Sequence, residues 1–302
     1  MMLLLDSGNS RLKVALVCQD AAGVWQYAAE PVALTHDAVE TELPTWVAER
    51  LAERLAEPSP AGLAAHVATQ ATASLALTGS LQGAIGVNVA GPQAAERIAR
   101  ALLPCGIGSI DWQIPGDATL GLRNGYRVPT QLGSDRWMGL VGIWTSVDVQ
   151  TAPASGQQPR QLVNFGTATT VDTISPDGVF VGGLIVPGWN LMRDALAQRT
   201  AQLPTAAGSV LDFPADTHDA ITSGSAAAQA GAVLRQWMIA RARFGAPPAL
   251  YITGGASDAV IAEIAQLLAL TGVLVPLHRV AHPVLDGLRA VLRQRANHAI
   301  GA

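Results

Sequence analysis

Residues 3–17 read LLLDSGNSRLKVALV, and this stretch predicts a β-hairpin at the start of the chain. Leucine fills a first strand at residues 3–5, and a second apolar strand at residues 12–17 follows a polar turn at residues 6–10. Asn, Gly and Ser are common in turns because they adopt tight backbone conformations at little cost. For this segment taken alone, an ordinary hairpin turn therefore stays open as an alternative to a functional loop.

The same pattern returns about 150 residues later, roughly the length of one domain. Residues 161–174 read QLVNFGTATTVDTI and predict a strand at 161–163, a polar turn at 164–169 and a strand at 170–174. Before them, residues 149–160 (VQTAPASGQQPR) are rich in turn-forming residues and predict an exposed connector. The repeated opening predicts two similar lobes, residues 1–150 and 151–302.

The rest of the chain alternates between strand and helix patterns. Apolar runs predict strands at residues 83–89, 179–186 and 249–253. Helical patterns cover residues 37–57, with a possible interruption at Pro44, and residues 92–103, 133–144, 217–242, 258–270 and 284–297. Alternating strands and helices in two similar halves indicate an α/β protein with a cleft between two lobes.

Composition narrows the classes of partner. Of the 302 residues, 49% are hydrophobic and 14% are charged, which excludes a disordered chain. The net charge is −4, so we expect no basic surface that could neutralise the phosphates of a nucleic acid. The longest apolar runs, residues 137–144 and 267–277, are shorter than the ~20 residues that a membrane-spanning helix needs. We therefore expect neither a nucleic-acid nor a membrane partner.

The two cysteines indicate the compartment. Cys18 and Cys105 lie far apart and form no CxxC pair, so neither a disulfide framework nor a zinc site is predicted. The apolar stretch at residues 1–5 is ended by Asp6 and lacks a basic flank, unlike a secretory signal. We therefore expect a soluble protein of the reducing cytoplasm.

The first hairpin has the chemistry of a phosphate site. A turn built on Gly8 and Asn9 can point several backbone N–H groups at one spot, which suits an anion. Lys13 can add a positive charge from the second strand, and Asp6 can hold Mg²⁺, usually through water. Side-chain donors come from Ser7, Asn9 and Ser10. The P-loop pattern GxxxxGK[ST] is absent from the sequence, so a different kind of phosphate loop is predicted.

The second hairpin repeats this logic. Residues 164–170 read NFGTATT and surround one glycine with three threonines, again a combination of close backbone approach and hydroxyl donors. Each loop has a plain turn as its alternative. Two such loops in matching positions of two halves are much harder to explain by accident, so together they favour a site for a polyphosphate.

A third motif places an acidic and a basic side chain next to each other at the start of a helix. Residues 126–137 read YRVPTQLGSDRW and lead into the helix predicted from residue 133. Asp135 could accept the proton of an attacking hydroxyl, while Arg136 and the helix N-terminal amides hold an anionic substrate. The alternative is a solvated helix cap.

These motifs together resemble those of a known family. DSGNSRLK (6–13), LGSDRW (132–137), NFGTATTVD (164–172) and GGLIVPG (182–188), in that order and spacing, are similar to type III pantothenate kinases. The resemblance extends over nearly the whole chain. It implies two actin-like, ribonuclease H-like ATPase lobes, as in acetate and sugar kinases, heat-shock chaperone ATPases and actin. It also implies transfer of the ATP γ-phosphate to the primary hydroxyl of pantothenate, the first step of coenzyme A synthesis.

The resemblance further implies residue roles. It places Asp135 as the proton acceptor. It assigns to the binding of ATP, together with Mg²⁺, the residues Asp6, Ser7, Gly8, Asn9, Ser10, Arg11, Leu12, Lys13 and Thr167. It places around pantothenate the residues Tyr126, Gly133, Ser134, Asp135, Arg136 and Thr217. Known members are homodimers with the pantothenate pocket near the subunit interface, so a homodimer is expected.

The sequence departs from the family at one position. The second phosphate loop usually begins with an aspartate that binds an activating K⁺ or NH₄⁺, but this chain has Asn164. Asparagine keeps a carbonyl ligand and loses a full negative charge, so affinity for the cation should fall.

Two other functions are alternatives. Another kinase or phosphohydrolase of the superfamily would keep both loops and need a different acceptor site, against which GSDR and the upstream tyrosine argue. Family members have also been described as accessory factors of virulence-gene expression, so a non-catalytic regulator is the second alternative. The acids and bases at Asp6, Lys13, Asp135 and Arg136 favour retained chemistry.

Overall fold

The computed structural model describes residues 1–56, 81–146, 158–199, 208–255 and 258–300. The chain forms two compact units. Unit 1 comprises Met1–Pro115, Leu132–Gly142 and Val284–Ala302, and unit 2 comprises Gly116–Gln131 and Ile143–Pro283. The division into lobes 1–150 and 151–302 stays a prediction. The predicted connector lies mostly outside the described residues, but its last residue, Arg160, begins a strand.

A sheet with its strands in the order β3-β2-β1-β5-β6 forms the centre of unit 1, and β4 also pairs with β2. The strands are β1 (Met2–Ser7), β2 (Arg11–Gln19), β3 (Trp25–Tyr27), β4 (Val32–Thr35), β5 (Gly83–Asn88) and β6 (Ile110–Trp112). β1 and β2 are antiparallel and confirm the predicted hairpin. Leu3, Leu4 and Leu5 are all fully buried, so both faces of β1 are covered.

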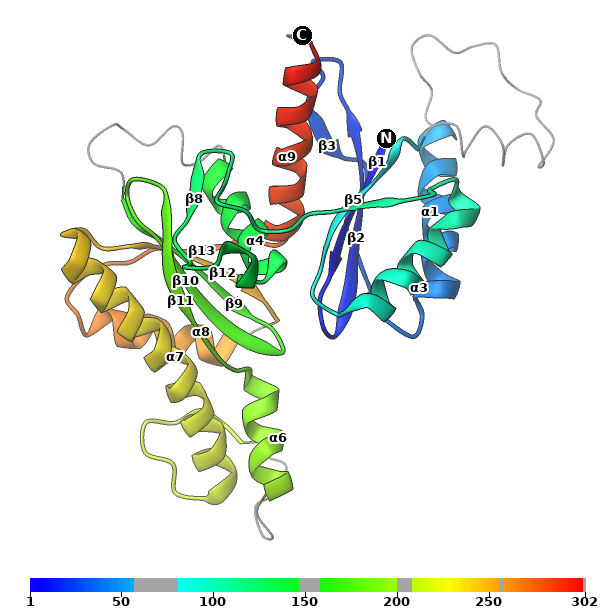
Figure 1. Cartoon of the computed structure of the whole chain (residues 1–302). Helices are drawn as coiled ribbons and strands as arrows, with labels where there is room; N and C mark the ends of the chain where they lie inside the picture. Colours follow the sequence, from blue (N-terminus) through cyan, green and yellow to red (C-terminus); the bar gives the residue numbers. More distant parts are fainter. Residues whose placement is uncertain (57–80, 147–157, 200–207, 256–257, 301–302) are drawn as a thin grey trace. The chain divides into compact units, whose positions relative to one another are not determined.

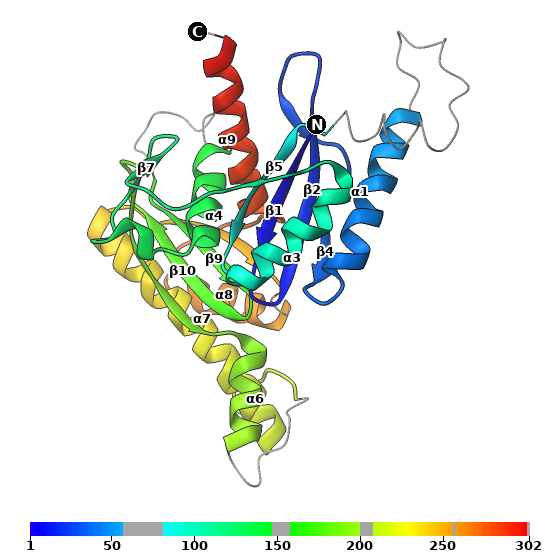
Figure 2. The ribbon, with the colours of Figure 1, turned by 45° about the vertical axis from the view of Figure 1, so that its right-hand side comes forward.

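The helices of unit 1 are α1 (Val39–Ala56), α3 (Pro92–Leu102), the short η1 (Leu103–Cys105), most of α4 (Ser134–Thr145) and α9 (Pro283–Ile300). α1 and α3 lie side by side on one face of the sheet (Figures 1 and 2). The predicted interruption at Pro44 is wrong, because α1 continues through it. Pro44 lies near the start of the helix, and the buried neighbours Leu43 and Val47 hold this turn on the core.

The sheet of unit 2 has the order β13-β12-β9-β10-β11-β8-β7. Its strands are β7 (Ala118–Thr119), β8 (Leu122–Asn124), β9 (Arg160–Phe165), β10 (Ala168–Ile174), β11 (Val179–Pro187), β12 (Ala249–Gly254) and β13 (Leu277–Arg279). The turn predicted at residues 164–169 is shorter than expected, since only Gly166 and Thr167 separate β9 from β10. Phe165 and Thr169 are buried and favour the strand conformation.

The helices of unit 2 are η2 (Pro129–Gln131), α6 (Trp189–Arg199), α7 (Thr217–Phe244) and α8 (Asp258–Ala269). α7 and α8 pack on one face of the sheet (Figure 1), where Trp237 and Ile264 join Val163 and Ile252 in one apolar core. The sequence did not predict α6 or the short strands β3, β4, β6, β7, β8 and β13. None of the described helices combines the length and apolarity that a bilayer span requires.

Both sheets contain the same arrangement of five strands. The order β3-β2-β1-β5-β6 in unit 1 matches β11-β10-β9-β12-β13 in unit 2. In each, the first strand of a hairpin also pairs in parallel with a strand that follows later in the chain, β1 with β5 and β9 with β12. The predicted α/β fold with two similar halves is therefore confirmed.

Candidate functional site

The first hairpin carries a buried ion pair at its turn end. Asp6 in β1 lies opposite Lys13 in β2, with 3.4 Å between Oδ2 and Nζ. Asp6 is only 5% exposed, whereas the Lys13 side chain is 39% exposed. Burial raises the pKa of Asp6, the Lys13 ammonium and its hydrogen bond lower it, and the Asp135 carboxylate raises it further. An additional cation beside Asp6 would thus be electrostatically favourable.

The turn itself is held by backbone and offers polar groups. The Gly8 N–H donates to the Arg11 carbonyl at 3.1 Å, and Asn9, Ser10 and Arg11 are exposed. Ser7 is fully buried, and its hydroxyl has no hydrogen-bond partner among the described residues. A buried hydroxyl without a partner is unusual and suits a ligand atom or a water. This turn therefore combines backbone N–H groups with the hydroxyl of Ser7 and, beside it, the ammonium of Lys13.

Leu12 stands apart from the other predicted nucleotide-binding residues. Its side chain is fully buried in the apolar core of unit 1, while its backbone belongs to the β1–β2 ladder opposite Ser7. A nucleotide contact from Leu12 could come from the backbone alone.

The N-terminus of α4 holds the predicted proton acceptor. The Gly133 carbonyl accepts the Trp137 N–H at 3.0 Å, and Asp135 Oδ1 accepts the N–H of Arg136 at 2.7 Å. A Cβ on Gly133 would lie 2.7 Å from Asp135 Oδ1, so glycine leaves room for the carboxylate. Ser134 begins the helix and Arg136 is nearly buried. Unit 1 thus brings together Asp6 and Asp135, whose charges interact.

The second hairpin is neutral at the corresponding place. Asn164 in β9 is partly buried and lies opposite Thr170 in β10 and Thr253 in β12. The Gly166 N–H donates to the Ala168 carbonyl at 3.1 Å, which closes the turn and leaves Thr167 exposed. Neutral carbonyl and hydroxyl groups can bind a weakly held cation or a phosphate.

Gly188 supports this second turn. Its N–H donates to the Thr167 carbonyl at 3.0 Å. A Cβ at residue 188 would overlap the carbonyl oxygens of Gly166 and Thr167, so only glycine fits here. Gly188 is the last residue of the GGLIVPG motif, which explains why that motif accompanies the loop.

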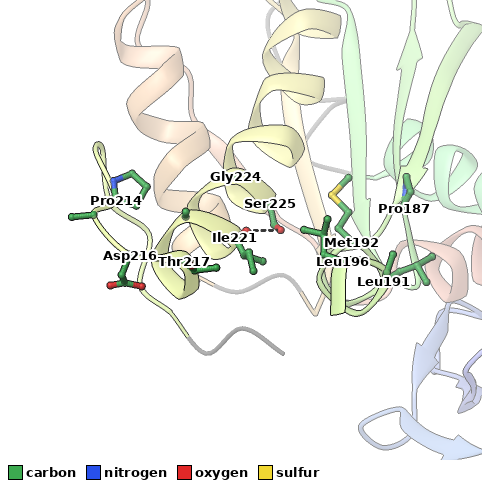
Figure 3. A pocket seen from close by; sticks show the side chains of 13 residues that line it. Pro187, Leu191, Met192, Leu196, Pro214, Asp216, Thr217, Ile221, Gly224 and Ser225 are labelled. Carbon is green, nitrogen blue, oxygen red and sulfur yellow. Dashed lines mark hydrogen bonds between the residues drawn. The ribbon is translucent and has the colours of Figure 1, made fainter. Parts of the chain in front are cut away.

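An apolar cavity of about 930 Å³ lies between α6 and the start of α7 in unit 2 (Figure 3). Leu191, Met192 and Leu196 of α6 face Ile221 of α7. The polar groups are Asp216, Thr217 and Ser225. Such a cavity suits a small ligand with an apolar body and a few polar ends. Sequence reasoning selected Thr217 but missed the wall formed by α6.

Asp216 lines this cavity and is the N-cap residue of α7. Its carboxylate caps α7 and accepts the Asp219 N–H at 3.0 Å. These backbone hydrogen bonds at the helix start, that of Asp219 foremost, lower the pKa of Asp216. The neighbouring Thr217 is exposed and begins the helix.

Tyr126 also belongs to unit 2. It follows β8, and its ring centroid lies 5.2 Å from that of Phe180, while its N–H binds Asn124 Oδ1 at 3.1 Å. The predicted site residues thus form two sets. Unit 1 carries residues 6–13 and 133–136, and unit 2 carries Tyr126, Asn164, Thr167 and Thr217.

Known proteins match the chain over nearly its full length. The family model for type III pantothenate kinases matches residues 2–239. The type III pantothenate kinase of Bordetella pertussis is 43% identical over 302 residues, 98% of this chain and 99% of the relative. That of Leptothrix cholodnii is 34% identical, with 97% of each chain covered.

A solved structure shares the fold. The protein from Campylobacter jejuni titled a conserved putative Baf family transcriptional activator matches with a TM-score of 0.51 at 15% identity, over 98% of this chain and 99% of its own. At this identity the match shows the fold alone. The family model and the full-length relatives carry the assignment, and the chain belongs to the type III pantothenate kinase family.

Proposed function

We propose that this chain is a kinase that transfers the γ-phosphoryl group of ATP to the primary hydroxyl of pantothenate. The product is 4'-phosphopantothenate, and the reaction is the first step of coenzyme A synthesis. Family membership supports this substrate pair. The observation that carries the chemistry is the pairing, within unit 1, of a polar hairpin at Asp6–Lys13 with a carboxylate at the start of α4.

The first hairpin would hold the triphosphate. Lys13 and the turn N–H groups supply positive charge and donors, and the unpartnered Ser7 hydroxyl offers one more. Mg²⁺, when bound, neutralises charge on the phosphate oxygens. Asp6 fits such an ion, usually through water, because its buried carboxylate has Lys13 as its single ion-pair partner among the described residues. One carboxylate is enough, since Mg²⁺ takes most of its ligands from phosphate and water.

Asp135 would orient the hydroxyl and accept its proton. A carboxylate is a far weaker base than an alkoxide, so Asp135 cannot deprotonate the alcohol beforehand and the proton should move late. Phosphoryl transfer depends mainly on alignment and charge stabilisation. The N–H of Arg136 fixes one Asp135 oxygen at 2.7 Å, which leaves the other for the substrate.

Pantothenate has a carboxylate at one end and a branched apolar group beside its primary hydroxyl. We propose that Arg136 and the amides at the α4 N-terminus attract this anionic substrate. Thr217, Tyr126, Gly133 and Ser134 complete the proposed set. Within unit 2, the cavity beside Thr217 joins an apolar wall to polar groups and suits a small ligand of this chemistry.

Three further properties follow from the family and are proposed with it. The chain forms a homodimer, which the exposed Leu191, Leu196, Leu211 and Phe213 near the cavity support. It acts in the cytoplasm, which agrees with the free thiols of Cys18 and Cys105. Any binding of K⁺ or NH₄⁺, by contrast with the family, should have a lowered affinity, because Asn164 offers a carbonyl oxygen and no negative charge.

A coupled assay of ADP release tests the function. The protein is incubated with ATP, Mg²⁺ and pantothenate, sugars or acetate in turn, each with and without K⁺ or NH₄⁺. We expect ADP release with pantothenate and with none of the other acceptors. The pantothenate product should be heavier by one phosphoryl group. Release with another acceptor would favour a different kinase of the superfamily. Binding of ATP without turnover of any acceptor would favour the non-catalytic regulator.

A further inference from the structure

A side chain from outside the first hairpin binds its turn. Nε2 of His36 lies 2.7 Å from the carbonyl oxygen of Gly8. A carbonyl oxygen can only accept, so His36 Nε2 must carry a proton and donate it. Residue 36 belongs to none of the sequence motifs, so no local pattern predicts this contact.

The register of β4 explains why residue 36 is available. β4 is antiparallel to β2 and runs beside it (Figure 2), with Thr35 opposite Arg11, the first residue of β2. His36, the residue after Thr35, therefore lies beside the turn that joins β1 and β2. Leu34 before it and Val39 after it are buried in the core of unit 1, which anchors both sides of His36. The imidazole thus belongs to a turn that buried residues hold on both sides.

The hydrogen bond orients a peptide plane. In a trans peptide the C=O and the following N–H point in opposite directions. Because His36 holds the Gly8 carbonyl on its own side, the N–H of Asn9 must point to the opposite side. Gly8 has no Cβ to restrict this plane, so an outside hydrogen bond is an effective way to select one orientation. The N–H of Gly8 is already bound to Arg11, which holds the other edge of the residue.

We propose that His36 is a positioning residue for the phosphate loop. It holds the Gly8 carbonyl away from the ligand, so that the turn presents N–H groups instead of carbonyl oxygens to the nucleotide phosphates. This inference rests on the proposed function of residues 6–13. His36 itself contacts the loop and not the ligand, so it should affect ATP binding and leave the chemical step intact.

The test compares two substitutions at His36. His36→Leu removes the donor, and His36→Gln keeps an N–H donor on a flexible side chain. The readouts are the Kd of Mg·ATP by titration calorimetry, and kcat with the KM values for ATP and pantothenate. We expect His36→Leu to weaken ATP binding and raise its KM roughly 3- to 10-fold, the effect of one neutral hydrogen bond. The kcat and the KM for pantothenate should change less than about twofold, and His36→Gln should recover much of the ATP affinity.

His298→Leu is the matched control. Nδ1 of His298 also lies 2.8 Å from a backbone carbonyl, that of Gln294, but in the last turn of α9. It should leave the ATP affinity at the wild-type value.

Three outcomes would overturn the inference. These are wild-type affinity in His36→Leu, equal losses in His36→Leu and His36→Gln, or a parallel loss of kcat and pantothenate affinity with a lowered Tm. Lys13→Ala separates this inference from the proposed function. If Lys13→Ala binds ATP like the wild type, the hairpin is not the phosphate site at all. If Lys13→Ala weakens binding and His36→Leu does not, only the role of His36 fails.

Discussion

The two hairpins share one strand arrangement and differ in charge and in support. The β1–β2 hairpin places Asp6 opposite Lys13, whereas the β9–β10 hairpin places Asn164 opposite Thr170. A side chain, His36, binds the first turn, and the backbone of Gly188 binds the second. The difference shows that the strand pairing supplies a common frame, while each turn acquires its own chemistry from a few residues. The first turn end carries a carboxylate paired with an ammonium, and the second carries neutral amide and hydroxyl groups.

The largest effect on kcat should come from Asp135, the carboxylate whose charge interacts with Asp6 of the first hairpin. Asp135→Asn removes the proposed proton acceptor and keeps the side chain nearly isosteric. General-base catalysis contributes about 10²–10⁴ in rate, so kcat should fall by that order. The Kd of Mg·ATP should change little, since Asp135 serves the acceptor alcohol. Steady-state kinetics and calorimetry measure the two quantities.

Asp194→Asn, in an exposed part of α6, is the control for loss of one negative charge and should keep wild-type kcat. Turnover by Asp135→Asn near the wild-type value would exclude Asp135 as the base.

The next effect concerns the support of the second turn. A Cβ at Gly188 would overlap two backbone carbonyl oxygens, which cannot move independently of β9 and β10. Gly188→Ala should therefore lower the free energy of unfolding by about 1–3 kcal/mol, as overpacking commonly does. Urea denaturation measures it. Gly231→Ala in α7, where a Cβ meets no atom within 4 Å, should be neutral or slightly stabilising. Equal stabilities of the two variants would show that the second turn tolerates a shift.

Asp6→Asn makes the first hairpin resemble the second. The pKa of Asp6 is raised in the fold, mainly by burial and further by Asp135. The folded state therefore binds its proton more tightly than the unfolded state, and stability falls as pH rises from about 3.9 through the raised pKa. We expect Asp6→Asn to have a higher Tm than the wild type at neutral pH, with the difference vanishing at acid pH. Calorimetric scans across this pH range measure it.

The same variant should need more Mg²⁺. Loss of the carboxylate should raise the Mg²⁺ concentration for half-maximal rate about tenfold, which one lost charged contact explains. An unchanged Mg²⁺ requirement would remove Asp6 from the metal site. A difference in Tm between the variant and the wild type that stays the same across the pH range would contradict the raised pKa of Asp6.

The hairpins and the duplicated fold were predictable, because local patterns carry them. Alternation of apolar strands with Gly- and Asn-containing turns is visible at residues 3–17 and 161–174. Two features were not predictable from such patterns. The turn support by His36 depends on the register of β4, a short edge strand with little pattern of its own. The interaction of Asp6 with Asp135 joins residues far apart in the sequence, so only the family resemblance suggested it.

The predicted helices lie within three residues of the observed ones at each end, but two features of the helices were missed for a similar reason. α1 passes through Pro44 because tertiary packing of Leu43 and Val47 outweighs the local preference of proline. α6 has no acidic residue in its first turn and exposes Leu191 and Leu196, and its role became clear only from the cavity it forms with α7. Tertiary contacts between residues far apart in the sequence determined these two helices, and local helix propensity did not.

The smallest effect should come from restoring charge in the second hairpin. Asn164→Asp introduces the carboxylate that the family usually has there, beside neutral Thr170 and Thr253. A partly exposed charge contributes on the order of 1 kcal/mol to binding a cation, so the K⁺ or NH₄⁺ concentration for half-maximal activation should fall roughly threefold to tenfold. Asn164→Ser, which stays neutral, should not lower it. If both variants respond alike to K⁺, charge at residue 164 does not determine the affinity for the cation. The hairpins would then differ mainly in the residues that hold their turns, His36 and Gly188.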